Sequence, residues 1–241
     1  MVLIDTSARP AWFGVASPPP PGEGKGGGAR VQQSARSTGA LLPPPPGPLP
    51  AAGGGLLLVR QLGTGRRDGD RLVAELAGLV DESGVSLCTL TALVVARGPG
   101  SFTGLRSGIA AAQGLARATG VPLIGVDSLE LAARAVEGEV GERVAPLAAG
   151  RKGLVYGAVF EILAAGEMRR IDPVAERTFA QWQGRCAPAT RMVLAGAPVP
   201  EIAQMESPTR TARLRAAVRF AATAAPSEPG ELLPLYVRDW M

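Results

Sequence analysis

The residues best suited to chemistry lie in a glycine-rich run, Gly98 to Gly108, which reads Gly-Pro-Gly-Ser-Phe-Thr-Gly-Leu-Arg-Ser-Gly. It follows an apolar stretch at 93–96 that predicts a buried strand, and it leads into 109–118, which favours a helix. A strand, a tight glycine loop and a helix can present backbone N–H groups to an anion. The same geometry can let another backbone or helix approach closely, so both uses stay open at this point.

The glycine run matches none of the common nucleotide-binding or nucleophile motifs. No lysine follows its last glycine, as a Walker A loop requires, and the spacing after Gly100 differs from the dinucleotide fingerprint. Ser101 lacks the flanking glycines of a nucleophile elbow. We therefore expect Gly98 and Gly100 to form a turn. Ser101 or Thr103 is then expected to cap the helix.

Small residues recur at every fourth position of the predicted helix. Gly104, Gly108 and Ala112 therefore lie on one face. Such a stripe lets a second helix approach closely, either in this chain or in a partner. We favour this helix contact over an anion site. An apolar pattern at 72–80 predicts an earlier helix, which Gly84 is expected to end.

An acidic residue at the end of the first expected strand is a second candidate site. Residues 2–4 predict a strand that enters Asp5-Thr6-Ser7, where α/β folds that handle nucleotides often place a phosphate or Mg²⁺ contact. The alternative, which we favour, is a strand end with an Asx or Ser turn. A third candidate is the segment 149–156, a basic hairpin turn that contains Arg151 and Lys152 and lies between two expected strands. Its alternative is a solvated loop.

Composition narrows the classes of function. The 241 residues contain no histidine, which excludes a Ser–His–Asp triad, a Cys–His dyad and every His-ligated metal site. Cys88 and Cys186 have no CxxC partner, and no apolar stretch reaches the length of a membrane span, so we expect a cytoplasmic protein with reduced thiols. The net charge of +4 could favour an RNA-containing complex, or could follow from the codon usage of a GC-rich genome.

Strands and helices alternate along most of the chain, which indicates α/β architecture. Asp127, with Glu130 three residues on, predicts a helix start with a side-chain cap. Leu214 and Val218 fall on one side of the helix predicted at 210–224. Further strands are expected at 11–16, 56–59, 123–126, 144–148, 154–162 and 192–195.

Residues 17–55 interrupt this pattern with many glycines and prolines. We expect a flexible insertion in a hairpin connection, with a proline-rich ligand for another protein as the alternative. The remaining elements suggest two lobes. We expect 1–121 plus 208–241 to form the N-terminal lobe and 122–207 to form the second lobe.

Taken in order, these segments resemble the TsaB family, also called YeaZ-like. The family's central motif is close to GPGSFTGLRxGxAxAxGLA, which residues 98–116 follow. The segments Leu-Ile-Asp-Thr-Ser at 3–7, Pro-Leu-Ile-Gly-Val at 122–126 and Pro-Leu-Tyr-Val-Arg at 234–238 are also similar to family segments. The resemblance implies the actin/hexokinase/Hsp70-like (ASKHA) fold, with two lobes and mixed sheets flanked by helices.

The resemblance also implies a part in adding the N6-threonylcarbamoyl group to the adenosine beside the tRNA anticodon. It implies a non-catalytic subunit that binds and supports a catalytic TsaD-like paralogue. A TsaE-like ATPase would be a further partner, tRNA would be reached through the complex, and the chain alone could form a homodimer. No cofactor, metal or catalytic residue is expected. The alternative is a nucleotide-dependent transferase or peptidase-like enzyme that acts on its own.

The family pairs through helices of the first lobe, which correspond here to 70–82 and to the helix after the glycine loop. We expect the partner interface to comprise Leu72, Leu76, Leu79, Val80, Gly104, Leu105, Gly108 and Ala112. Asp5 and Thr6 are expected to be remnants of a nucleotide site. The chain departs from the family pattern because 67–70 lacks a histidine, Ala149 stands in place of an acid and the insertion is unusual.

Overall fold

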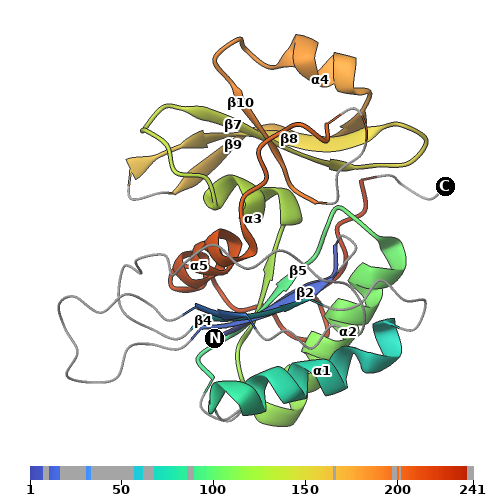
Figure 1. Cartoon of the computed structure of the whole chain (residues 1–241), viewed down its shortest axis with the longest axis vertical. Coiled ribbons are helices and arrows are strands. Elements are labelled where there is room, and N and C mark those ends of the chain that lie inside the picture. The colour runs from blue at the N-terminus through green and yellow to red at the C-terminus, as the bar shows by residue number, and fades with distance from the viewer. Residues whose placement is uncertain are drawn as a thin grey trace.

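Two lobes, each built on one β-sheet, stack on each other in the computed structural model (Figure 1). The two-sheet α/β architecture that the sequence predicts is confirmed. The structure describes residues 1–7, 11–16, 31–33, 57–61, 68–85, 90–164, 167–196, 200 and 202–237. Side chains are described throughout these ranges, except at 31–33, 57 and 68–70.

The first sheet has six strands, which are β1 (Val2–Asp5), β2 (Trp12–Ala16), β3 (Val31–Gln33), β4 (Leu57–Gln61), β5 (Leu93–Ala96) and β6 (Leu123–Val126). Their order is β3-β4-β2-β1-β5-β6. β1, β5 and β6 run parallel, whereas β2 is antiparallel to both of its neighbours. The central strands are buried on both faces, as their continuous apolar runs favour.

Helices cover both faces of this sheet, and they are α1 (Asp68–Ser83), α2 (Phe102–Thr119) and α5 (Arg210–Ala221). Successive residues of β1 point to opposite faces. Val2 and Ile4 therefore pack in one apolar cluster with α1 and α2, and Leu3 packs in a second cluster with α5. These helices confirm the predictions for the three segments, and Gly84 follows α1 with a φ of +66°.

The second sheet has four strands, which are β7 (Arg143–Ala149), β8 (Val155–Ile162), β9 (Met168–Arg177) and β10 (Arg191–Leu194), in the order β10-β7-β8-β9. On one face lies α3 (Ser128–Arg134), which packs through Leu129 and Ala132. On the other lies α4 (Phe179–Arg185), which packs through the fully buried Trp182. α3 and α5 therefore lie between the two sheets (Figure 1).

The second lobe contains two elements that the sequence pattern does not predict. β9 mixes charged and apolar residues without a clear period, and α4 is only 7 residues long. In α5, Leu214 is buried as expected, but Val218 is 40% exposed. The buried face of this helix continues through Ala216 and Ala217 instead.

The segment 17–55 contains one described strand. Val31–Gln33 forms β3 at the edge of the first sheet, parallel to β4, so the expectation of a wholly flexible insertion is corrected there. The other residues of the segment lie outside the described residues. β2 and β4 are antiparallel neighbours, with Ala16 opposite Leu57, which confirms that the segment joins paired strands.

The chain first crosses between the lobes at Asp127. β6 completes the first sheet, so the lobe boundary expected after residue 121 moves to 126. Asp127 precedes α3 as predicted, but its side chain does not cap the helix. Its carboxylate binds Arg97 and Arg170 instead, because two guanidinium groups offer stronger hydrogen bonds than one amide.

The packing of α1 predicts unequal effects for two of its apolar residues. Leu76 is 1% exposed in the core, whereas Val73 is 52% exposed. Leu76→Ala should lower the free energy of unfolding by about 2–5 kcal/mol. Val73→Ala should change it by about 0.5 kcal/mol or less. Urea denaturation of both variants measures the difference, and equal losses would contradict this orientation of α1.

Candidate functional site

Asp5 is buried at the end of β1 and is 3% exposed. Its Oδ1 accepts hydrogen bonds from the backbone N–H of Ser7 at 3.1 Å and from the Ser7 hydroxyl at 2.6 Å. Its Oδ2 accepts one from Trp12 Nε1 at 3.1 Å, and a guanidinium nitrogen of Arg213 lies 4.0 Å away. The bond from Ser7 N–H forms the Asx turn that the sequence favours. The carboxylate is thus held in structural contacts.

The glycine run forms the turn and cap that its residues predict. Gly98 has a φ of +111°, a conformation that favours glycine. The Ser101 N–H donates to the Ser7 carbonyl oxygen at 2.6 Å. A Cβ on Gly100 would lie 2.0 Å from that same oxygen, so the two loops touch through their backbones. Ser101 Oγ then accepts from Gly104 N–H at 3.3 Å and caps α2.

The small-residue face of α2 packs on the turn at 5–7 rather than on another helix. A Cβ on Gly104 would lie 2.3 Å from the Thr6 carbonyl oxygen. A Cβ on Gly108 would lie 2.2 Å from Thr6 Oγ1, which has no hydrogen-bond partner among the described residues. The close approach predicted for this stripe exists, but its partner is a turn of the same chain.

All but one of the residues predicted to form the partner interface are buried inside the first lobe. Gly104 is half-buried, Gly108 is buried, and the other six are at most 3% exposed. The prediction is therefore corrected, because none of the buried residues can contact a partner in this fold. An apolar stripe marks which face of a helix is covered, but it does not say which chain covers it. The residues concerned are Leu72, Leu76, Leu79, Val80, Gly104, Leu105, Gly108 and Ala112.

A pocket of about 310 Å³ lies where the two lobes meet. The first lobe supplies the glycine loop and the start of α2, and the second lobe supplies the ends of β7 and β10 and the hairpin after β7. A segment that follows α5 closes one side. The lining residues are Ser7, Leu105, Tyr156 and the segments 99–102, 148–151, 195–196 and 235–237.

The chemistry of this pocket differs from that of a metal–nucleotide site. Among the described residues that line it there is no Asp or Glu, and no described group of acids and cysteines is arranged to hold a metal ion. Asp5 and Thr6 do not line the pocket, although the predicted nucleotide remnant includes both. Arg151 lines it, and the exposed pair Arg151-Lys152 lies in the β7–β8 hairpin as expected.

An aromatic and cationic cluster forms the rim of the pocket. The rings of Phe102 and Tyr236 lie 5.7 Å apart. The Arg106 guanidinium lies 4.1 Å from the centroid of Phe102, and its Nε donates to the Tyr236 hydroxyl at 3.2 Å. From the sequence, Tyr236 stands out only as part of the segment 234–238. The similarity of that segment to one of the family's segments is the one signal that could have marked it.

Comparison with known proteins places this geometry in a family. A family model described as TsaD, tRNA N6-adenosine threonylcarbamoyltransferase, matches residues 65–205. The tRNA threonylcarbamoyladenosine biosynthesis protein TsaB of Escherichia coli is 39% identical over 97 residues, which are 40% of this chain and 42% of that protein. An uncharacterized protein of Mycobacterium tuberculosis is 30% identical over 180 residues, which are 72% of this chain and 76% of that protein.

A solved structure has the same fold over nearly the whole chain. YeaZ from Pseudomonas aeruginosa superposes with a TM-score of 0.64 and 25% identity, and the match covers 98% of each chain. Two stacked lobes with mixed sheets, helices on their faces and a pocket between them define a protein of the ASKHA fold class. Within that class, the chain belongs to the TsaB (YeaZ-like) family.

The two faces of α2 predict opposite effects for the same substitution. Gly104→Ala forces a methyl group against the Thr6 carbonyl oxygen and should lower the free energy of unfolding by about 1–3 kcal/mol. A Cβ at Gly114 meets nothing within 4 Å, so Gly114→Ala should raise that free energy by about 0.5–1 kcal/mol. Urea titration of the two variants tests this, and a stable Gly104→Ala chain would refute the close contact.

Proposed function

We propose that this chain is a non-catalytic scaffold subunit of the machinery that adds the N6-threonylcarbamoyl group to adenosine beside the tRNA anticodon. In this proposal it binds and supports a TsaD-like catalytic paralogue. Family membership supports the pathway, because E. coli TsaB is named for tRNA threonylcarbamoyladenosine biosynthesis. The observation that carries the scaffold role is the solvent-facing surface of α1 and α2.

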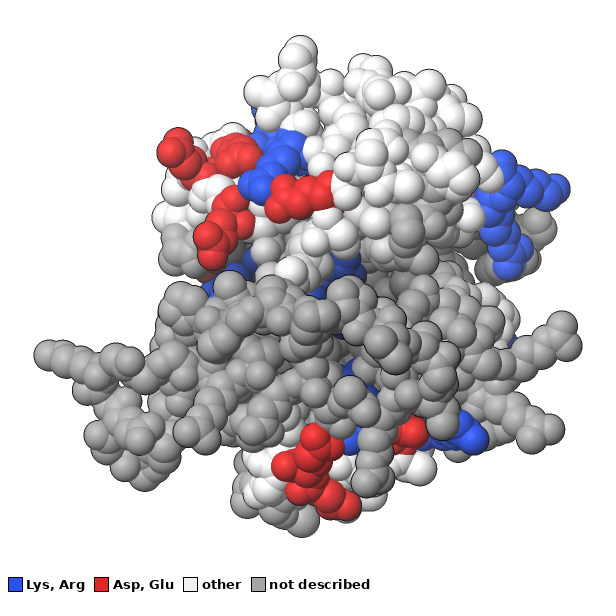
Figure 2. Space-filling model, in the orientation of Figure 1, with Lys and Arg blue, Asp and Glu red and all other residues white. Residues whose placement is uncertain are grey.

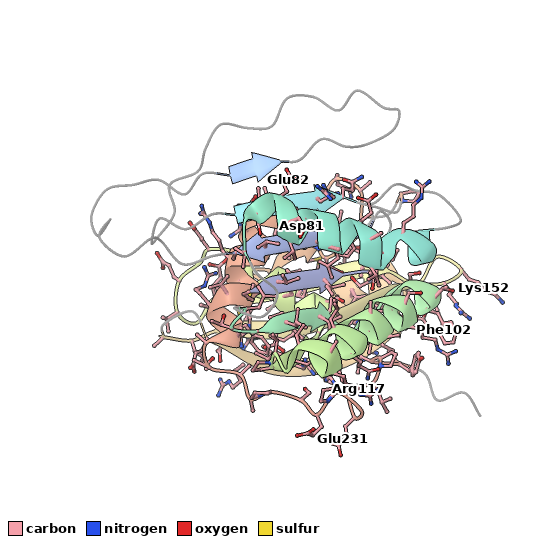
Figure 3. The ribbon with its side chains drawn as sticks, turned by 90° about the horizontal axis from the view of Figure 1, so that it is seen from below. Asp81, Glu82, Phe102, Arg117, Lys152 and Glu231 are labelled. Carbon is pink, nitrogen blue, oxygen red and sulfur yellow. The ribbon has the colours of Figure 1, made fainter. Side chains whose placement is uncertain are left out.

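The outer helix face consists of Val73, Ala74 and Ala77 on α1 and of Ala110 and Gly114 on α2, all exposed. Figure 3 looks onto α1 and α2, which lie side by side. Because these side chains are small, a partner helix can approach the backbone of either helix. The family resemblance points to these two helices, and the exposed residues replace the buried ones as the proposed contact.

Charged residues surround this small, apolar centre. Asp81 and Glu82 lie near the end of α1, and Arg117 lies near the end of α2 (Figure 3). Arg71 and Arg106 are also exposed on the same two helices. An apolar centre with a polar rim is the usual composition of a specific protein interface. The face therefore suits a helical partner with small or apolar residues at its own centre.

The proposal that this chain is not catalytic is supported by the contacts and burial of the residues that were candidates for catalysis. Asp5 is engaged by Ser7 and Trp12, and Thr6 is buried outside the interlobe pocket. The chain has no histidine to act as a base. The alternative, an enzyme that acts alone, would need Asp5 to leave its contacts before it could reach a substrate.

The remaining partners in this proposal are reached through the complex. A TsaE-like ATPase and tRNA would join the pair, and two copies of this chain could meet through the outer helix face when the paralogue is absent. On the described part of the face in Figure 2, acidic and basic side chains lie close together on the left of the upper lobe, and a separate group of basic side chains lies on its right. In this proposal tRNA is contacted mainly through the partner. Within the described ranges, every helix is too short or too polar to span a bilayer, and a cytoplasmic location is part of the proposal.

A charge placed on the outer helix face should break the complex without unfolding the chain. Ala77→Arg should reduce co-purification with the TsaD-like paralogue by at least about tenfold, which corresponds to about 1.4 kcal/mol. N6-threonylcarbamoyladenosine in tRNA, measured by mass spectrometry of nucleosides, should fall with it. Gln183→Arg on the exposed side of α4 is the matched control and should change neither quantity. Full retention of both by Ala77→Arg would refute this interface.

Turnover by the isolated chain separates the scaffold from the enzyme. The purified chain should hydrolyse no ATP above the background of a mock purification. Asp5→Asn keeps the shape of the side chain and one of its two acceptor oxygens, and it should likewise show no hydrolysis. ATP hydrolysis that is present in the natural chain and lost in Asp5→Asn would support the enzyme instead.

A further inference from the structure

Along its described residues the chain passes between the lobes twice, and a buried charged residue lies at each passage. The first passage joins β6 to α3 and contains Asp127, which is 4% exposed. The second joins β10 to α5, and Arg213 of α5 is 7% exposed. Both residues contact groups from the two lobes at once.

At the first passage, Asp127 holds one arginine from each lobe. Its Oδ1 accepts from Arg97 Nε at 2.9 Å, and Arg97 directly follows β5 of the first sheet. Its Oδ2 pairs with Arg170, which belongs to β9 of the second sheet. The neighbouring Ser128 N–H also donates to the carbonyl oxygen of Gly98 at 2.7 Å. The start of α3 is thereby joined to both sheets.

At the second passage, Arg213 joins α5 to the end of β10. It donates to the carbonyl oxygens of Leu194 at 2.9 Å and Ala195 at 3.0 Å. The Asp5 carboxylate of the first sheet lies 4.0 Å from the same guanidinium. Burial lowers the pKa of Arg213, and Asp5 opposes that shift. Groups from both lobes therefore stabilise the buried guanidinium of Arg213.

Apolar packing fills the space between these two points. Leu131 of α3 shares one buried cluster with Leu3 of β1 and Leu214 of α5. Arg219 of α5 also donates to the carbonyl oxygen of Arg134, at the end of α3. The lobes thus meet through directional polar contacts at both passages and a continuous apolar layer between them.

We propose that Asp127 and Arg213 form an interlobe lock that holds the two lobes at one fixed angle. Rotating one lobe would separate Asp127 from Arg97 or Arg170 and would leave the buried carboxylate with only one of its two cationic partners, which is unfavourable. The directional contacts at the two passages oppose twisting of one lobe against the other, and the apolar layer between them opposes their separation. The pocket takes walls from both lobes, so its width is fixed, and the chain behaves as a rigid body with or without a partner.

Distance measurements between spin labels on the two lobes test the lock directly. Cys88 and Cys186 are replaced by serine, and labels are attached through Asp81→Cys on α1 and Gln183→Cys on α4, both exposed positions. Double electron–electron resonance on this otherwise natural chain should give one narrow distance distribution. A broad or two-peaked distribution would overturn the proposal, because the lobes would then move without any lock being broken.

Removing the charged residues should release the lobes. Asp127→Ala and Arg213→Met should each broaden or split the distance distribution, while circular dichroism stays that of the folded chain. If either variant fails to fold, Asp127→Asn decides the question, because it removes the buried charge, while Arg97 and Arg170, whose side chains are 39% and 36% exposed, keep their contact with solvent. A distribution that stays narrow in the folded variants would overturn the lock.

The chain supplies a matched control on the same strand. Arg169, next to Arg170 on β9, pairs with Glu161 of β8 within the second sheet and makes no contact of the lock. Arg169→Gln removes a similar arginine–carboxylate pair and should leave the distance distribution unchanged. Equal broadening in Arg169→Gln would show that any lost ion pair loosens the chain, and it would overturn the specific role of Asp127.

Discussion

The backbone of the turn at 5–7 lies directly on the glycine face of α2, and the first lobe is organised around this contact. Because Gly104 and Gly108 have no side chains, the helix can lie against β1 and its first turn can reach the boundary between the lobes. The same turn engages Asp5 in hydrogen bonds and places Ser7 on the wall of the pocket. The contact between this turn and α2 therefore underlies the core packing, the hydrogen bonding of Asp5 and the shape of the pocket.

Local patterns predict much of this fold. The apolar run before the glycine loop, the Ser101 cap and the glycine turn are short-range features, and each is found where its residues indicate. The motif at 98–116 identifies the family because many of its positions, at fixed spacing, have a structural role. Glycines allow backbone contact, a hydroxyl caps the helix and small residues form the buried face. Such a combination rarely occurs by chance.

The sequence pattern does not show which residues that are distant along the chain contact each other in the fold. The helical spacing of Leu76 and its apolar neighbours shows that one face of α1 is covered. A sheet of the same chain and a helix of a partner protein would both favour that spacing. Asp127 has the local signature of a helix cap, yet two arginines distant in sequence compete successfully for its carboxylate. β9 takes its stability from β8 and from cross-strand partners, so its own residues show no strong periodicity.

The register between β2 and β4 bears on how this chain tolerates unusual sequence. Ala16 and Leu57 lie opposite each other, so the ladder ends at the same pair whatever length of chain joins them. The entropy of closing a loop grows slowly with its length, by about 0.6 kcal/mol for each doubling. Outside β3, which pairs with β4, insertions and deletions between these residues should therefore cost little folding free energy. Low-complexity sequence can accumulate there over generations while the pocket and the outer helix face stay unchanged.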